Sequence, residues 1–234
     1  RYALPQKRTA LSMLASPNLA ARYIGWQQLN KVGAAAEGTL VKLWQGDDQR
    51  LRARALHLLA RIDGLEKKYI GMALGDDNPD IRITGLRIAR ERGIDVIPLV
   101  KQLAGDPSAG VRRECAIALR HNESPEAPAL WAKLAQQHDG NDRWYLEALG
   151  LALDRQQDKF FGAWLEVVGS EWDTLAGRDI VWRSRSKKTP DLLVKILLDE
   201  KTGEADKPRY IRALDFQSGP EKEAALIKLL SAGG

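Results

Sequence analysis

The sequence has a single cysteine, Cys115, and only three histidines in 234 residues. One cysteine excludes an internal disulfide. His57, His121 and His138 lack the close spacing of metal ligands, so we expect no metal, haem or other cofactor in this segment. Cys115 stands 30 positions after Gly85 in a repeated pattern. This predicts a small buried residue at a helix contact rather than a nucleophile.

Long apolar runs and strand patterns are also absent. Apolar stretches are short, and those at 192–194 and 196–198 are separated by a lysine. None approaches the roughly 20 residues that a membrane span needs. No sustained alternation of β-branched residues indicates a strand, and so no glycine-rich phosphate loop can follow one. The sequence therefore predicts an all-α fold without a transmembrane helix.

A turn with aspartate, followed by a helix with an early arginine, occurs twice. The two copies pair Asp76 with Asp106, Ile81 with Val111, Arg82 with Arg112 and Gly85 with Cys115, each 30 positions apart. A fixed period of this size is typical of stacked helical hairpins. We predict an α-solenoid of about six to seven HEAT-like pairs that form a right-handed superhelical arc.

Helical periodicity and breaks at Gly, Pro, Ser and Asn predict the individual helices. The expected pairs are 6–15 with 19–33, 35–45 with 50–62, 65–74 with 80–92, 96–104 with 111–120, 125–137 with 144–153, 160–168 with 180–184, and 190–198 with 209–214. A last helix, 221–230, is expected to lack a partner and to expose an apolar face. We predict one solenoid domain, 1–234, with regular repeats at 6–157 and divergent repeats at 158–234.

Core positions are expected on the second helix of each pair. In the second pair the expected inner stripe is Leu51, Ala55, Leu58, Leu59 and Ile62. The second helix of the first pair carries Leu19, Tyr23, Trp26 and either Leu29 or Val32 at helical spacing.

The repeated aspartates and arginines predict a structural ladder. The five fixed donors of an arginine can bond a turn carboxylate or the carbonyls of a neighbouring repeat. We assign Asp76, Arg82, Asp106, Arg112 and the less regular Arg52 to this ladder. The pattern resembles the HEAT repeat. This resemblance implies an architecture and no particular activity.

A longer resemblance covers most of the chain. Residues 16–23, 80–87, 111–116, 142–150 and 208–217 resemble the helical segment of multidomain membrane-bound dehydrogenases of planctomycete and verrucomicrobial bacteria. Those proteins combine a sorbosone-dehydrogenase-like β-propeller, HEAT repeats and a haem-binding cytochrome c domain. This sequence has neither a propeller nor a Cys-x-x-Cys-His motif.

The resemblance implies a non-catalytic scaffold that binds proteins or neighbouring domains within a larger oxidoreductase. It also implies an extracytoplasmic, periplasmic location. The first residues contain no initiator methionine and no signal-peptide core, so we expect a fragment of a longer chain.

Positive charge is concentrated on three predicted helices. Residues 49–63, 80–93 and 111–121 contain eleven arginines and four acids, whereas the whole chain carries +5. The ladder and the helix C-termini account for most of these arginines. Arg54, Arg87 and Arg113 remain as possible partner-binding residues, and a solvated face is the simpler alternative. A second basic cluster, 183–188, is expected to be a solvated helix end.

Two other functions stay open from the sequence. Some HEAT-like proteins are DNA glycosylases with a basic concave face, although we do not favour nucleic acid as the partner. Carbohydrate binding would use exposed tryptophans, of which the chain has seven in all. The spacing of Trp144 with Leu151 and of Trp164 with Val168 instead predicts core positions.

Overall fold

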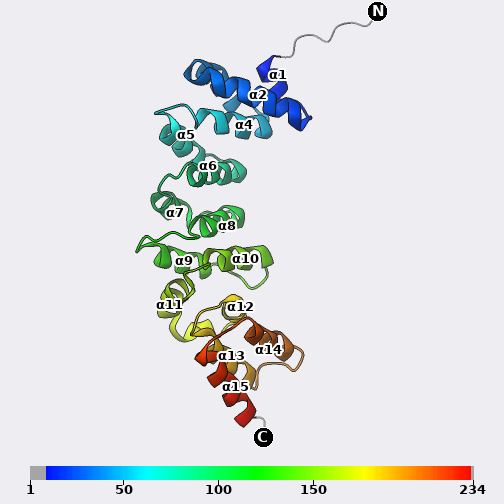
Figure 1. The fold of residues 1–234 in the computed structure, drawn as a ribbon, viewed down its shortest axis with the longest axis vertical. Helices are drawn as coiled ribbons and strands as arrows, with labels where there is room; N and C mark the ends of the chain where they lie inside the picture. Colours follow the sequence, from blue (N-terminus) through cyan, green and yellow to red (C-terminus); the bar gives the residue numbers. More distant parts are fainter. Residues whose placement is uncertain (1–8, 233–234) are drawn as a thin grey trace, which may run out of the picture. The chain divides into compact units, whose positions relative to one another are not determined.

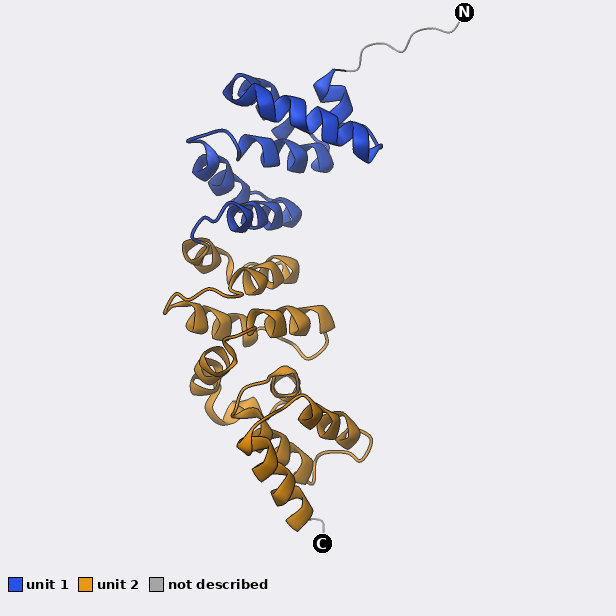
Figure 2. Ribbon diagram, in the orientation of Figure 1, with its two compact units in different colours: residues 1–95 blue, residues 96–234 orange. Residues whose placement is uncertain are grey.

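The computed structural model describes residues 9–232, and every regular element in that range is a helix. The prediction of an all-α fold is confirmed for these residues. The chain divides into two compact units, residues 1–95 and 96–234 (Figure 2). The predicted single solenoid domain, with regular repeats at 6–157 and divergent repeats at 158–234, stays a prediction. Residues 6–8 of the first predicted helix lie outside the described residues.

Unit 1 consists of consecutive helix pairs (Figure 1). Helices α1 and α2, α3 and α4, and α5 and α6 pack together, and α4 also contacts both α2 and α6. The second helices of the pairs therefore form a layer of their own. The helices are α1 (Ala10–Leu14), α2 (Leu19–Val32), α3 (Glu37–Trp44), α4 (Gln49–Leu59), α5 (Glu66–Leu74) and α6 (Pro79–Glu91), with a 3₁₀ segment at Gly33–Ala36.

Unit 2 continues the alternation in two layers. Helices α7, α9 and α11 contact one another in order, as do α8, α10, α12 and α14. The helices are α7 (Ile97–Leu103), α8 (Ala109–Ala118), α9 (Ala127–Ala135), α10 (Arg143–Ala152), α11 (Gln157–Val168), α12 (Leu175–Arg183), α13 (Thr189–Leu198), α14 (Lys207–Asp215) and α15 (Pro220–Ala232), with a 3₁₀ segment at Gly169–Trp172.

Side-chain caps start the second helix of most pairs. An Asn, Asp or Thr oxygen accepts a hydrogen bond from a backbone N–H two or three residues later, over 2.8–3.1 Å. Each cap satisfies N–H groups that have no partner inside the helix. Thr174 is the cap that starts α12 at Leu175, five residues before the predicted start at 180. The capping residues are Asn18, Asp48, Asn78, Asp142 and Thr174.

Two small residues mark close helix contacts. A Cβ on Gly25 would lie 2.6 Å from the carbonyl oxygen of Ala10 and 2.7 Å from the backbone nitrogen of Leu14. Glycine is therefore what lets α1 and α2 pack backbone to backbone. Cys115 in α8 is fully buried, and burial is the main cause that raises the pKa of its thiol to about 12. A buried, protonated thiol agrees with the predicted packing role.

The inner stripe predicted for 50–62 is confirmed at Ala55, Leu58, Leu59 and Ile62, which are buried, whereas the apolar spacing of α2 does not match its buried face. Leu19 is 72% exposed, and Tyr23 and Val32 also face solvent, whereas Leu29 is buried. Helix α2 packs against α1 and α4 through the face that carries Gly25 and Leu29. Apolar periodicity identifies a face of a helix, but it cannot show whether another element covers that face.

The last helix has a partner, contrary to the prediction. Helix α15 packs against α13, with Ala225 buried and the Lys228 ammonium 2.7 Å from the Asp191 carboxylate. Ile227 and Leu230 remain exposed, as expected for the apolar face of this helix. The sequence could not show this contact, because α15 packs on a helix two elements earlier and not on α14.

Candidate binding site

Two of the predicted ladder arginines tie each helix to the turn before it. Arg82 donates from Nη1 to the carbonyl of Asp76 (2.7 Å) and to that of the next residue (3.1 Å). Arg112 does the same to Asp106 (2.7 Å) and the residue after it (3.1 Å). The Asp side chains cap their own turns, each accepting a backbone N–H two residues later. The identical geometry explains why both residue types recur at this offset.

A third arginine in the first pair makes the same contact. Arg22 donates from Nη1 to the carbonyls of Ser16 (3.3 Å) and Pro17 (3.0 Å). The turn before Arg22 lacks an aspartate, so the repeated pattern of aspartate and arginine does not include this contact. The hydroxyl of Ser16 takes the capping role, since it accepts the N–H of Asn18 at 3.2 Å.

Arg52 links two successive pairs of unit 1. Its Nη2 forms an ion pair with the carboxylate of Asp76, and its Nε donates to the carbonyl of Trp44 at 2.9 Å. The guanidinium also stacks over the Trp44 indole at 5.1 Å. These three contacts use the planar donor geometry that lysine lacks. A small pocket of about 380 Å³ lies against these groups, whose polar atoms are already bonded to one another.

The arginines predicted to bind a partner have other contacts. Arg54 donates to the carbonyl of Leu14 at 2.8 Å, and burial lowers the pKa of its guanidinium. Arg113 lies 3.7 Å from the carboxylate of Asp142. Arg87 is exposed. Two of the three therefore hold together parts of their own unit.

The tryptophans are mostly structural. Trp44, Trp131 and Trp164 are buried, whereas Trp144 is 70% exposed at the start of α10. The predicted core position of Trp164 is confirmed, and that of Trp144 is wrong. Its partner in the pattern, Leu151, is exposed as well.

A buried network that the sequence did not indicate joins α12 to α14. Asp179 accepts hydrogen bonds from Arg209 (2.6 Å) and pairs with Nε2 of His138 (3.3 Å). Burial raises the pKa of Asp179, but the two bonds outweigh burial and the net shift is downward. Arg209 stacks on Trp182 at 4.4 Å. The side chain of His138 is only 1% exposed, so this acid and base pair has no access to a substrate in solution.

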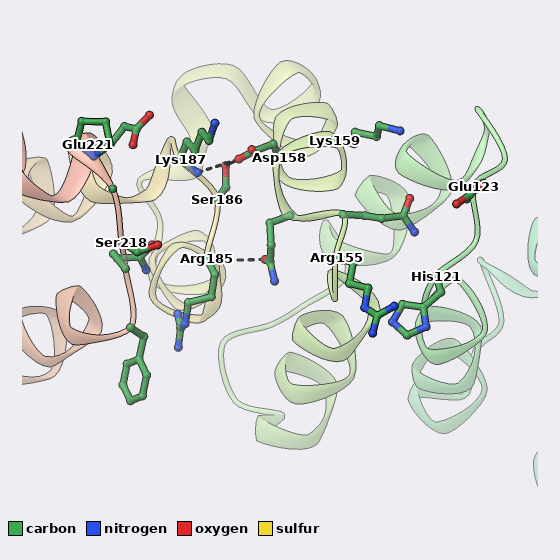
Figure 3. A pocket seen from close by; sticks show the side chains of 16 residues that line it. His121, Glu123, Arg155, Asp158, Lys159, Arg185, Ser186, Lys187, Ser218 and Glu221 are labelled. Carbon is green, nitrogen blue, oxygen red and sulfur yellow. Dashed lines mark hydrogen bonds between the residues drawn. The ribbon is translucent and has the colours of Figure 1, made fainter.

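A pocket with a volume of about 1060 Å³ lies in unit 2 (Figure 3). Four loops line it, those between α8 and α9, α10 and α11, α12 and α13, and α14 and α15. Each of these loops leads from one helix pair to the next. We call this site the loop pocket.

Hydrogen bonds between neighbouring loops form the floor of the loop pocket. Gln156 donates from its amide to the carbonyl of Asn122 at 3.1 Å, 34 residues away. Gln217 donates in the same way to the carbonyl of Ser184 at 3.0 Å, 33 residues away. Each glutamine thus ties one loop to the loop before it.

The middle of the floor is closed by Asp158. Its carboxylate accepts the N–H of Lys187 and the hydroxyl of Ser186, both at 2.8 Å (Figure 3). These bonds, led by the one from the Lys187 N–H, lower the pKa of Asp158. The carboxylate of Asp158 is therefore already hydrogen-bonded within the floor.

Two turns at the loop pocket have backbone conformations that are unusual for their residues. His121 has φ 60° and Arg155 has φ 62°, in the left-handed region. Both occupy the third place of a turn closed by an i+3 to i hydrogen bond, from Asn122 to Leu119 and from Gln156 to Leu153. The corresponding turn of unit 1, from Ile62 to Leu65, has Gly64 at that place, with φ 80°.

His121 is fixed by an acid next to Arg155. The carboxylate of Asp154 accepts from Arg120 (2.7 Å) and lies 2.8 Å from Nε2 of His121. These hydrogen bonds, Arg120 first and His121 second, lower the pKa of Asp154 to about 2.

The lining of the loop pocket includes unpaired cations and also two acids, Glu123 and Glu221. Arg155, Lys159 and Lys187 are exposed, and no carboxylate of the described residues forms an ion pair with their side chains. Arg185 lies beside them, with its guanidinium 4.8 Å from the ring of the exposed Phe216.

Comparison with models of known protein families and with curated protein sequences finds no match for this chain. Within residues 9–232, no helix has the length and apolar character that crossing a bilayer requires. In the same range, no three His, Cys, Asp or Glu side chains are grouped in a way that could hold a metal ion.

Proposed function

We propose that this chain is a non-catalytic scaffold in which helical hairpins stack as a HEAT-type solenoid and bind protein partners or neighbouring domains. The observation that carries the proposal is the turn contact of Arg22, Arg82 and Arg112, which recurs in three hairpins. A contact that recurs at the same place in three hairpins supports a repeated structural unit, and such units form an array by packing against their neighbours.

The resemblance to membrane-bound dehydrogenases extends this proposal. The parent protein would be an oxidoreductase with haem in another domain, and this segment would hold its domains in position outside the cytoplasm. The packing of α13 with α15 and the exposed Ile227 and Leu230 support a role in contacts with other polypeptide.

Cross-linking of the full-length parent protein, followed by mass spectrometry, tests the scaffold. We expect lysines of this segment to be linked to other domains of the chain or to one recurrent partner protein. Titration calorimetry of this segment against those domains should then give saturable binding. Absence of both results, or turnover of a substrate by the segment alone, would overturn the proposal.

The DNA-binding alternative has less support. It needs free cations on the second helices, yet Arg54 and Arg113 are engaged within their units. A binding constant for duplex DNA that falls steeply with salt would favour it. The carbohydrate alternative relies on Trp144, the most exposed indole, and quenching of its fluorescence by glycans would favour it.

A further inference from the structure

We propose that the loop pocket is a docking groove for a short acidic segment of a partner protein. The inference rests on the proposed scaffold function and names where the scaffold binds and what chemistry it selects. Pocket volume alone does not indicate which ligand binds. The floor, the two unusual turns and the arrangement of charge indicate the chemistry of the ligand.

The floor makes the groove rigid before anything binds. Gln156, Asp158 and Gln217 connect the four loops through side-chain to backbone bonds of 2.8–3.1 Å. Groups held in place in the free protein lose little conformational entropy on binding. A peptide would therefore meet loops whose backbones are already positioned.

The turns place side chains where glycine would be the relaxed choice. A non-glycine residue at positive φ is strained, and such strain concentrates at functional sites. His121 has a structural reason to stand there, because it binds Asp154. Arg155 has no such contact, although its position matches that of Gly64 in unit 1. Its side chain lies in the loop pocket beside His121 (Figure 3).

Charge in the groove favours an acidic ligand. Arg155, Lys159 and Lys187 are exposed cations, while the acid nearest to them, Asp158, is held by the floor. The first turns of α11 and α15 also line the loop pocket, and each carries an acid, Asp158 in α11 and Glu221 in α15.

The distribution of acids indicates a peptide rather than a nucleic acid. Glu123 and Glu221 lie on opposite sides of the loop pocket, with the cations between them (Figure 3). A continuous phosphate backbone would be repelled at both sides, whereas a peptide can carry acids only at its centre. The exposed ring of Phe216, next to Arg185, offers an apolar contact for a residue beside that centre.

Fluorescence anisotropy tests the proposal with the intact 234-residue chain. The probe is a labelled peptide with an acidic centre flanked by leucines, and the matched peptide has glutamines at its centre. We expect the acidic peptide to bind at least about tenfold more tightly than the glutamine peptide, with an affinity that decreases as salt rises. Equal binding of the two peptides would overturn the proposal.

Two charge-reversed variants locate the site. Changing Arg155, Lys159 and Lys187 to Glu should weaken binding of the acidic peptide at least about tenfold. The control changes the exposed Lys31, Lys67 and Lys133 to Glu, which alters net charge equally and should leave most of the affinity. The proposal fails if the pocket variant binds normally or if the control loses as much. It also fails if single-stranded oligothymidine competes as well as the peptide, since the site would then select polyanions.

Arg155→Gly separates binding from folding. Glycine relieves the backbone strain, so the melting temperature should not fall, while peptide affinity should decrease. A lower melting temperature together with normal affinity would contradict the proposal. If the domains of the parent protein still bind this segment but the acidic peptide does not, the scaffold stands and only the docking groove is wrong.

Discussion

Removal of the Asp76 carboxylate is expected to destabilise unit 1 by about 2–3 kcal/mol. The change Asp76→Ala removes a charge-assisted bond from Arg52, for which about 1.5–3 kcal/mol is typical, and the capping bond from the Asn78 N–H, about 0.5–1.5 kcal/mol. We discount the sum because both side chains keep some exposure, 17% for Arg52 and 11% for Asp76. Arg52 also keeps its bond to the Trp44 carbonyl.

A second substitution separates the two bonds. Asp76→Asn keeps an oxygen that can accept the Asn78 N–H but removes the charge, so it should cost about 1–2 kcal/mol. Combined with Arg52→Met in a double-mutant cycle, it should give a coupling free energy of about 1–2 kcal/mol. The Met side chain preserves most of the aliphatic contact of Arg52.

Urea denaturation of the whole chain, followed by circular dichroism, measures these changes. Glu204→Gln is the control, because Glu204 is 87% exposed in its pair with Lys207 and should change stability by less than about 0.5 kcal/mol. If Asp76→Ala also stays within about 0.5 kcal/mol of the parent, or if the coupling is zero, the ladder does not stabilise the fold.

Three further predictions follow from single sites. Gly25→Ala should destabilise the fold by about 1–3 kcal/mol, since the added Cβ would meet backbone atoms of α1. Gly38→Ala has open space around the added Cβ, so it should stabilise the fold by up to about 1 kcal/mol. Thermal melts of both variants measure these changes. The pKa of Asp154 in the folded protein, about 2, is below its ordinary value of 3.8. The ion pairs of Asp154 therefore contribute to the stability of the folded state above pH 3.8, and this contribution is lost towards pH 2. The melting temperatures of the parent and of Asp154→Asn should converge as pH falls through that window. Cys115 should react with a thiol reagent only after unfolding in guanidinium, and fast reaction of the native protein would contradict its burial.

The helices could be predicted well where local chemistry sets their limits. Asn18, Asp48 and Asn78 cap helices that begin within two residues of the expected positions, because a cap depends only on residues next to it. The start of α12 was missed by five residues, since the strongest apolar signal begins at Ile180 while the helix begins after Thr174.

Burial was harder to predict than helix position. Leu19, Tyr23 and Trp144 follow the spacing of core residues, yet all three are exposed. An apolar stripe shows which side of a helix avoids water in most proteins, but coverage depends on a neighbour that may be distant in sequence. Similarly, the α13 partner of α15 is not its sequence neighbour.

The loop pocket was not predicted, because the residues that join its loops are 28 to 34 positions apart in the sequence. The basic cluster 183–188 was expected to be a solvated helix end, and Lys187 instead bonds Asp158 through its backbone. One signal was present in the sequence. Turns that have Gly64 and Gly93 in unit 1 are followed in unit 2 by turns with His121 and Arg155, and loss of glycine at such places indicates that the side chain is needed.

Helix α1 has a consequence for the local stability of unit 1. Its five residues are too few to be stable alone, and its last carbonyl, that of Leu14, is bonded by Arg54, 40 positions later. The helical form of residues 10–14 therefore depends on packing against α2 and on the hydrogen bond from Arg54 of α4. In native-state hydrogen exchange, the amides of α1 should lose protection at lower denaturant than those of α4, as an opening of the chain end that leaves the rest of unit 1 intact.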